Sequence, residues 1–178
     1  MGAGSVVFSF ILLGIWASTY YAFADDIENL IRDPQELTIE LAYEDNPPDI
    51  RPQLPKLEYN TFTGYLPIPS DKGPGYRVNA QRFRYDFDLE EKESEEIRIF
   101  VTGGSFGWGA GVAQKYTYGA VSEKLLSELF PSSKIRVIVA GVAAFVSTQE
   151  RILVENTIYE HDPDILIQLS GWNDVYFG

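Results

Sequence analysis

Two polar side chains that could take part in a reaction follow glycines at points where buried strands are expected to end. Ser105 follows the apolar run 97–101 through a pair of glycines, and Asn173 follows the apolar run 165–169 through Gly171 and a tryptophan. A tight turn can present a serine hydroxyl above a sheet, and the backbone N–H groups that follow it can help to hold an oxyanion. The chemistry that Ser105 allows is therefore nucleophilic attack on a carbonyl carbon.

The elements that must position these side chains alternate along the second half of the chain. Apolar runs predict buried strands, and helical spacing predicts helices between them; the strands are expected at 97–102, 135–140 and 165–170, and the helices at 118–130 and 148–159. This alternation with short connections is typical of an α/β fold with a parallel sheet, here in the order 2-1-3. Ligands of such sheets bind beyond the carboxyl ends of the strands, where both side chains are expected.

Three other interpretations of the glycine-rich segment 103–109 compete with a nucleophile turn. A dinucleotide loop requires G-x-G-x-x-G and an acidic residue after the next strand, where this chain has Ala140 and Gly141. A P-loop requires a Gly-Lys-Ser/Thr sequence, and the segment has no lysine. The α/β-hydrolase elbow matches the G-x-S-x-G at 103–107, but it normally follows several earlier strands of its sheet.

The three predicted strand ends resemble, in chain order, sequence blocks of the SGNH (GDSL-like) hydrolases. GGS at 103–105 looks like their first block, 139–150 looks like the second block and its helix start, and GWND at 171–174 looks like their G-x-N-D block. Residues 76–84 are similar to the arm that precedes many bacterial members. The resemblance covers about residues 76–178 and implies a flavodoxin-like, three-layer parallel sheet, here incomplete.

The resemblance also implies the roles of individual residues. It places Ser105 at the nucleophile position, and Ala144 and Asn173 at oxyanion-hole positions. Ala144 stands where the family has a glycine that donates its backbone N–H, so its role requires a backbone φ that tolerates a Cβ atom. Gly104 stands where many members have aspartate. Neither a cofactor nor a metal is implied.

The base that would activate Ser105 is missing from the pattern. The sequence holds a single histidine, His161, expected near the end of a helix and on the wrong side of the sheet, as an exposed or capping residue. Asp174 is the nearest carboxylate by motif, but it follows the oxyanion amide. The family's Asp-x-x-His block is absent, and the loss of one triad member costs orders of magnitude in rate.

Two functions fit these expectations. The favoured one is a non-catalytic accessory subunit of a larger membrane complex, in which Ser105 and Asn173 are inherited structure and other transmembrane subunits cover the free sheet edge. The alternative is a membrane-tethered serine esterase or O-acyl hydrolase whose Asp-x-x-His lies beyond Gly178. Only such a longer form is expected to act on an ester substrate.

The N-terminal segment is apolar enough to enter a membrane. Residues 1–24 hold no ionisable side chain, and 6–24 are almost wholly apolar. About 20 such residues span the core of a bilayer, which predicts a single transmembrane anchor in contact with lipid. The AFA at 22–24 also fits a signal peptide, although no Lys or Arg precedes the apolar stretch. The domain is expected on the extracytoplasmic side.

Three regions follow from these patterns: the anchor at 1–24, a juxtamembrane region at 25–75, and the SGNH-hydrolase-like domain at 76–178. The middle region is expected to hold two short helices and a proline-rich, extended connector. At the start of the domain, 76–87 is expected to form a strand or hairpin arm, and the acidic run 90–96 a solvated loop.

Composition excludes several classes of function. The net charge of −12 at pH 7 makes most of the surface repel nucleic-acid phosphates. The absence of Cys excludes disulfides, thiolate metal sites and a cysteine nucleophile, and a single His excludes a multi-histidine metal site. With 178 residues, 45% of them hydrophobic, the chain can bury one ordinary core.

Overall fold

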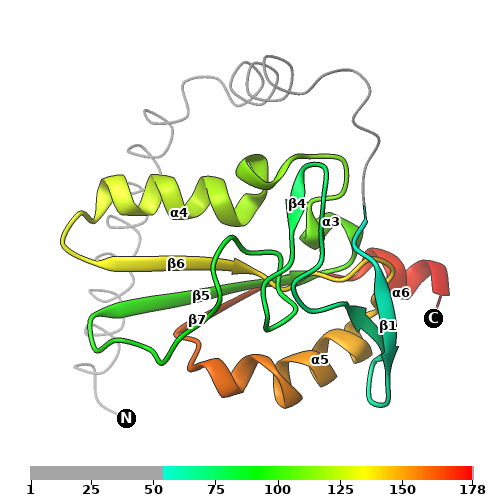
Figure 1. Ribbon diagram of the computed structural model, residues 1–178. Coiled ribbons are helices and arrows are strands. Elements are labelled where there is room, and N and C mark those ends of the chain that lie inside the picture. Colours follow the sequence, from blue (N-terminus) through cyan, green and yellow to red (C-terminus); the bar gives the residue numbers. More distant parts are fainter. Residues whose placement is uncertain (1–53, 178) are drawn as a thin grey trace, which may run out of the picture. The chain divides into compact units, whose positions relative to one another are not determined.

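A computed structural model describes residues 54–177 of the chain (Figure 1). The predicted anchor at 1–24 and the predicted juxtamembrane helices lie outside these residues. Within the described part, no helix is both long enough and apolar enough to cross a bilayer.

Three parallel strands form the central sheet, in the order β6-β5-β7. They are β5 (Glu96–Gly103), β6 (Lys134–Val139) and β7 (Ile165–Leu169). Ile99 of β5 lies opposite Val137 of β6 and Ile165 of β7. The parallel sheet and its strand order are therefore as the sequence predicts.

Helices lie on both faces of this sheet (Figure 1). α4 (Tyr118–Leu129) packs on one face and α5 (Ser147–Asn156) on the other. Successive side chains of a strand point to opposite faces, so Ile99 and Val101 join the core cluster with Leu126 of α4, whereas Phe100 joins the cluster with Leu153 of α5. The mixed α/β architecture is confirmed.

Shorter helices lie between and after these elements. They are α3 (Ser105–Trp108), α6 (Trp172–Phe177), and the 3-10 turns η1 (Gln114–Tyr116) and η2 (Ile158–His161). The predicted second helix, 148–159, is thus divided between α5 and η2. α3 and α6 both lie beyond the carboxyl ends of the strands, at the right of Figure 1.

The proline-rich connector is more ordered than the sequence predicts. Its described part contains β1 (Leu57–Asn60), which pairs antiparallel with β2 (Gly64–Pro67), and β3 (Lys72–Gly73), which pairs antiparallel with β4 (Tyr76–Arg77) at the start of the next region. The Tyr65 hydroxyl donates to Ala143 O at 3.0 Å, and Gln149 Nε2 donates to Thr63 O at 2.7 Å. The β1–β2 hairpin therefore braces the loop that precedes α5.

The strand or hairpin arm predicted at 76–87 is a strand only at its start, where β4 pairs with β3 and ends at Arg77. Beyond it the buried Asn79 folds the chain into a loop, since its Oδ1 accepts from Phe83 N at 2.9 Å and its Nδ2 donates to Phe87 O at 3.0 Å. Arg84 N then donates to Val139 O at 2.8 Å. An amide side chain thus replaces the strand ladder in this arm.

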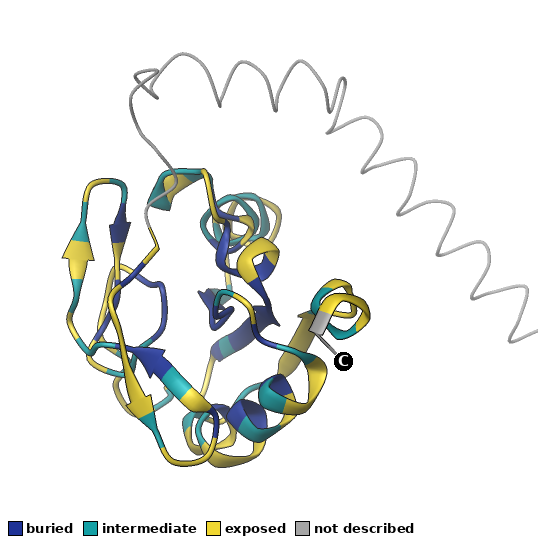
Figure 2. Cartoon of the chain, turned by 90° about the vertical axis from the view of Figure 1, so that its right-hand side faces the viewer, coloured by how far each residue is buried: buried dark blue, intermediate teal, exposed yellow. Residues whose placement is uncertain are grey.

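Exposure differs between the strands and over the surface. β5 and β6 are mostly buried, whereas every residue of β7 except Leu169 is exposed, which Figure 2 shows as yellow beside dark blue.

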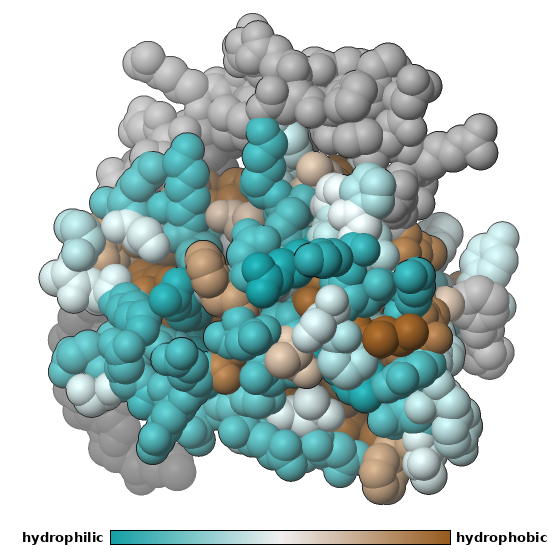
Figure 3. Space-filling view, viewed as in Figure 1, coloured by the Kyte–Doolittle hydropathy of each residue, from teal (hydrophilic) through white to brown (hydrophobic). Residues whose placement is uncertain are grey.

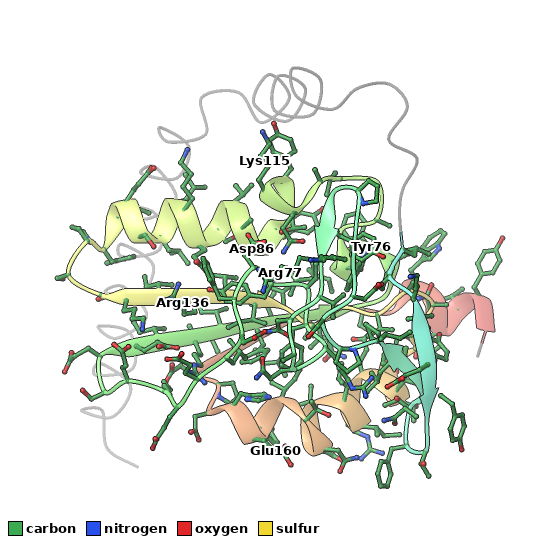
Figure 4. All side chains as sticks on the ribbon, in the orientation of Figure 1. Tyr76, Arg77, Asp86, Lys115, Arg136 and Glu160 are labelled. Atoms are coloured by element: carbon green, nitrogen blue, oxygen red, sulfur yellow. The ribbon has the colours of Figure 1, made fainter. Side chains whose placement is uncertain are left out.

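Figure 3 shows one face of the molecule, on which hydrophilic side chains predominate. Figure 4 shows Lys115 on the side of α4 and Glu160 on the side of α5, both exposed and on opposite sides of the sheet.

Candidate functional site

A cavity of about 690 Å³ lies beyond the carboxyl ends of β5 and β7. Ser105 and Asn173 both line it, together with Phe106, Trp172 and the buried Glu150. Cavities that hold small ligands usually measure about 300–1,000 Å³ and occur at this edge of parallel sheets. The structure therefore brings two of the three sequence-predicted site residues to one cavity.

Close backbone packing positions Ser105 at the first residue of α3. Gly103 has a φ of 145°, and a Cβ atom on it would lie 2.5 Å from Leu169 O. A Cβ on Gly141 would lie 2.3 Å from Trp108 N, so α3 can approach the loop after β6 only because that residue is glycine. Ser105 itself is exposed, and its hydroxyl makes no hydrogen bond to another described residue.

Arg84 fixes the segment that follows α3. Its side chain is buried, and its guanidinium donates to the carbonyl oxygens of Gly75, Trp108, Gly109 and Val112 at 2.7–3.0 Å. Its Nε donates to Gln114 Oε1 at 3.0 Å. Burial lowers the pKa of Arg84 to about 10, partly offset by the charge of Asp86. One cation thus holds together the end of α3, the loop that follows it and Gly75.

The amide of Asn173 is held directly above the Ser105 turn. Its Nδ2 donates to Phe145 O at 2.7 Å. A Cβ atom on Gly104 would lie 2.3 Å from that same nitrogen, so the amide occupies the space that an aspartate at this position would need. An amide nitrogen carries two hydrogens, and the second of them remains for an oxygen atom of a ligand.

Asp174 acts as a helix cap. Its Oδ1 accepts from Ser147 N at 3.0 Å and from Ser147 Oγ at 2.5 Å, at the start of α5. The hydrogen bond from the Ser147 hydroxyl lowers the pKa of Asp174. Its carboxylate accepts the first backbone N–H of α5 and so ties α6 to the start of α5. This bond holds Asn173 in place and engages Asp174 away from Ser105.

Ala144 is the predicted site residue that does not line the cavity. It is exposed in the loop between β6 and α5, although its neighbour Phe145 is a lining residue. Its φ is 63°, in the left-handed region that glycine adopts without cost. Ala144, which stands where the family has glycine, therefore has a strained backbone conformation in the structure.

Replacing Ala144 with glycine is expected to stabilise the protein by about 0.5–1 kcal/mol, because the left-handed strain is relieved at a smaller cost in unfolded-state entropy. Ala143→Gly is the matched control, since Ala143 lies in the same loop without a positive φ. It is expected to destabilise the protein by about 0.5–1 kcal/mol. Urea unfolding of both variants measures this difference, and equal shifts in one direction would contradict the assignment of strain to Ala144.

His161 lies far along the strands from Ser105. It ends η2, before the first residue of β7, whereas Ser105 follows the last residue of β5. Its ring centroid is 5.5 Å from that of Phe83 and 6.4 Å from that of Phe100, and burial lowers its pKa. The expectation of an exposed or capping histidine is therefore wrong in detail, since His161 is a half-buried core residue, but it is not placed to activate Ser105.

Glu150 is the site residue that the sequence analysis did not single out. It lies in the first turn of α5, is 1% exposed, and accepts a hydrogen bond from Gln168 Nε2 at 3.0 Å. Burial raises its pKa, and the hydrogen bond from Ser170 opposes this rise. The signal was present in the sequence, because Glu150 shares a helix face with the apolar Leu153 and Val154.

Neither metal ligands nor known relatives identify this site. Among residues 54–177, no group of three His, Asp or Glu residues comes together to hold a metal ion. No protein-family model matches the chain, and no curated protein matches it. The site has to be interpreted from its own geometry.

Proposed function

We propose that residues 76–178 form an SGNH-hydrolase-like domain that binds an ester in the cavity without hydrolysing it. The convergence of the Ser105 hydroxyl and the Asn173 amide on one cavity carries this proposal. In the bound state the ester carbonyl oxygen accepts the second N–H of Asn173, and the carbonyl carbon lies against Ser105. Donors placed in this way recognise a carbonyl oxygen and stabilise charge on it.

The environment of Ser105 supports the proposal of binding without turnover. A serine attacks a carbonyl only when a base takes its proton, and that base must lie within hydrogen-bonding distance. The one imidazole of the chain packs against Phe83 and Phe100, and Asp174 caps α5. The Glu150 carboxylate accepts hydrogen bonds from Gln168 and Ser170 and makes none with Ser105.

The proposal is tested by titrating the full chain into neohexyl acetate labelled at its carbonyl carbon. The carbonyl NMR signal is expected to shift saturably while no acetate forms. Asn173→Leu removes the donor at similar volume, and is expected to weaken binding about tenfold, as the loss of one ligand hydrogen bond does. Asn156→Leu, at the exposed end of α5, is the control and is expected to bind as the unmodified chain does.

An esterase is the second candidate, and the same pair of side chains favours it. In that case Asp-x-x-His residues outside this chain supply the base, and Ser105 becomes an acylated nucleophile. Release of acetate from the ester in the titration, abolished by Ser105→Ala, would select this candidate. A constant carbonyl signal in the unmodified chain would refute both.

We further propose that the apolar segment 6–24 anchors the chain in a membrane as an accessory subunit of a larger complex. Its length supports insertion, and the exposed apolar side chains of β7 support cover by other subunits. After extraction of membranes with alkaline carbonate, the full chain is expected in the pellet. A variant without residues 1–24 is expected in the supernatant. Release of the full chain would contradict the anchor.

A further inference from the structure

The charge of the cavity is set by one residue. Among the described residues that line it, Glu150 is the only one with an ionisable side chain. The rest are neutral polar, glycine or apolar residues, so the cavity offers no cation to a carboxylate or phosphate ligand. An anionic ligand would meet both this carboxylate and a chain with a net charge of −12.

Glu150 is an unusual residue to find in such a place. It is 1% exposed, and among the described residues no Lys or Arg pairs with it. Its hydrogen-bonding partners, Gln168 and Ser170, are neutral. A buried carboxylate is costly unless a positive charge compensates it. A cation in the cavity would supply that compensation.

Aromatic rings line the same cavity as this carboxylate. Trp172 and Phe106 line the cavity and are 77% and 67% exposed, respectively, so part of each ring surface is open to a ligand. Trp172 stacks on Tyr176 at 6.4 Å between ring centroids, which holds its ring in place. Tryptophan over a cation is the most favourable cation–π pair, and aromatic walls with a carboxylate suit a quaternary ammonium group.

We propose that the cavity selects esters that carry an ammonium group, with Glu150 as the residue that determines this specificity. The inference rests on the proposed ester site and narrows its ligand class. The ester carbonyl lies between Ser105 and Asn173, and the ammonium group lies towards Glu150 and the ring of Trp172. No bond is made or broken in this step.

The selectivity for cations must depend on pH. Burial raises the pKa of Glu150, and the negative charge of Asp174 raises it further, against the hydrogen bonds of Gln168 and Ser170. Asp174, on α6, is the charged group that acts on Glu150 from the elements packed around it. A bound cation favours the ionised carboxylate, so the preference for cationic esters is expected above the raised pKa of Glu150 and is lost as the pH falls through it.

The test compares two esters of nearly equal shape. Acetylcholine carries a quaternary ammonium group, and neohexyl acetate carries a carbon atom in its place. Calorimetric titration of the full chain at neutral pH is expected to show acetylcholine binding at least about tenfold more tightly. Glu150→Gln is expected to bring the two affinities together, whereas Glu155→Gln, exposed on the same helix and paired with Arg151 at 3.2 Å, is expected to retain the preference.

Each outcome decides the inference. Equal affinity of the unmodified chain for the two esters would overturn the cation specificity and leave the ester site standing. Binding of neither ester would overturn the proposed function as well. If Glu150→Gln does not fold, the unmodified chain is titrated at falling pH, and a preference that persists at acidic pH would refute the role of Glu150.

Discussion

Replacing Arg84 with methionine is expected to destabilise the domain by at least about 3 kcal/mol. The variant leaves four backbone carbonyl groups without the donor that the guanidinium gives them. Each hydrogen bond to a charged group contributes about 1.5–3 kcal/mol, so the loss of two already reaches this value. Domains are stable by about 5–15 kcal/mol, and a loss of this size leaves little margin.

Urea unfolding of the variant beside Arg77→Met measures the effect. Arg77 is an exposed arginine of β4, only a few residues away, and its loss is expected to change stability by less than about 0.5 kcal/mol. Arg84→Lys keeps the charge with fewer donors and is expected to fall between the two. If the stability of Arg84→Met lies within about 1 kcal/mol of that of the unmodified protein, the hydrogen bonds of Arg84 to the backbone near the site do not have the proposed role.

Periodicity predicted the central sheet because its residues are compatible with few other structures. Ile99, Phe100 and Val101 are apolar without interruption, as a strand buried on both faces requires, and Thr117 caps α4 through a hydrogen bond from Ala120 N. At the ends of β5 and β6, Gly103 and Gly141 allow the backbone to approach more closely than a Cβ atom would permit. Local sequence was sufficient where local packing decides the structure.

Local sequence failed where distant groups decide the structure. The strand or hairpin arm expected at 76–87 ends early as a strand because Asn79 binds the backbone of Phe83 and Phe87. Arg84 binds the backbone of Trp108, 24 residues away, which no local pattern reveals. Glu96, expected in a solvated loop, is buried because Arg98 Nε donates to it at 2.5 Å. The contacts of Glu150 with Gln168 and Ser170 join α5 to the end of β7, and no spacing rule along one element reveals such a pair.

The site was partly predictable for the same reason. The order of the strand ends placed Ser105 and Asn173 at one edge of the sheet, since parallel strands end on the same side. The left-handed φ of Ala144 and the capping role of Asp174 depend on the exact path of two loops. Sequence reasoning could therefore name the residues that meet at the cavity, but could not say which of them point into it.

The central proposal is that the cavity binds an ester through Ser105 and Asn173, and that no residue among 54–177 acts on Ser105 as a base. A fluorophosphonate reacts only with an activated serine hydroxyl, because the hydroxyl must lose its proton as it attacks phosphorus. The Ser105 hydroxyl has no hydrogen-bond acceptor among the described residues. This chain is therefore expected to show no fluorophosphonate labelling, whereas an active serine hydrolase is labelled.

Treatment of the full chain with a fluorescent fluorophosphonate, next to an active serine hydrolase in the same reaction, is the most direct measurement of this claim. The hydrolase is expected to be labelled, and this chain is expected to show no label at Ser105. Labelling of a longer form alone would assign the base to residues beyond Gly178. Labelling of this chain that Ser105→Ala abolishes would contradict the account, because a base within these residues would then activate Ser105.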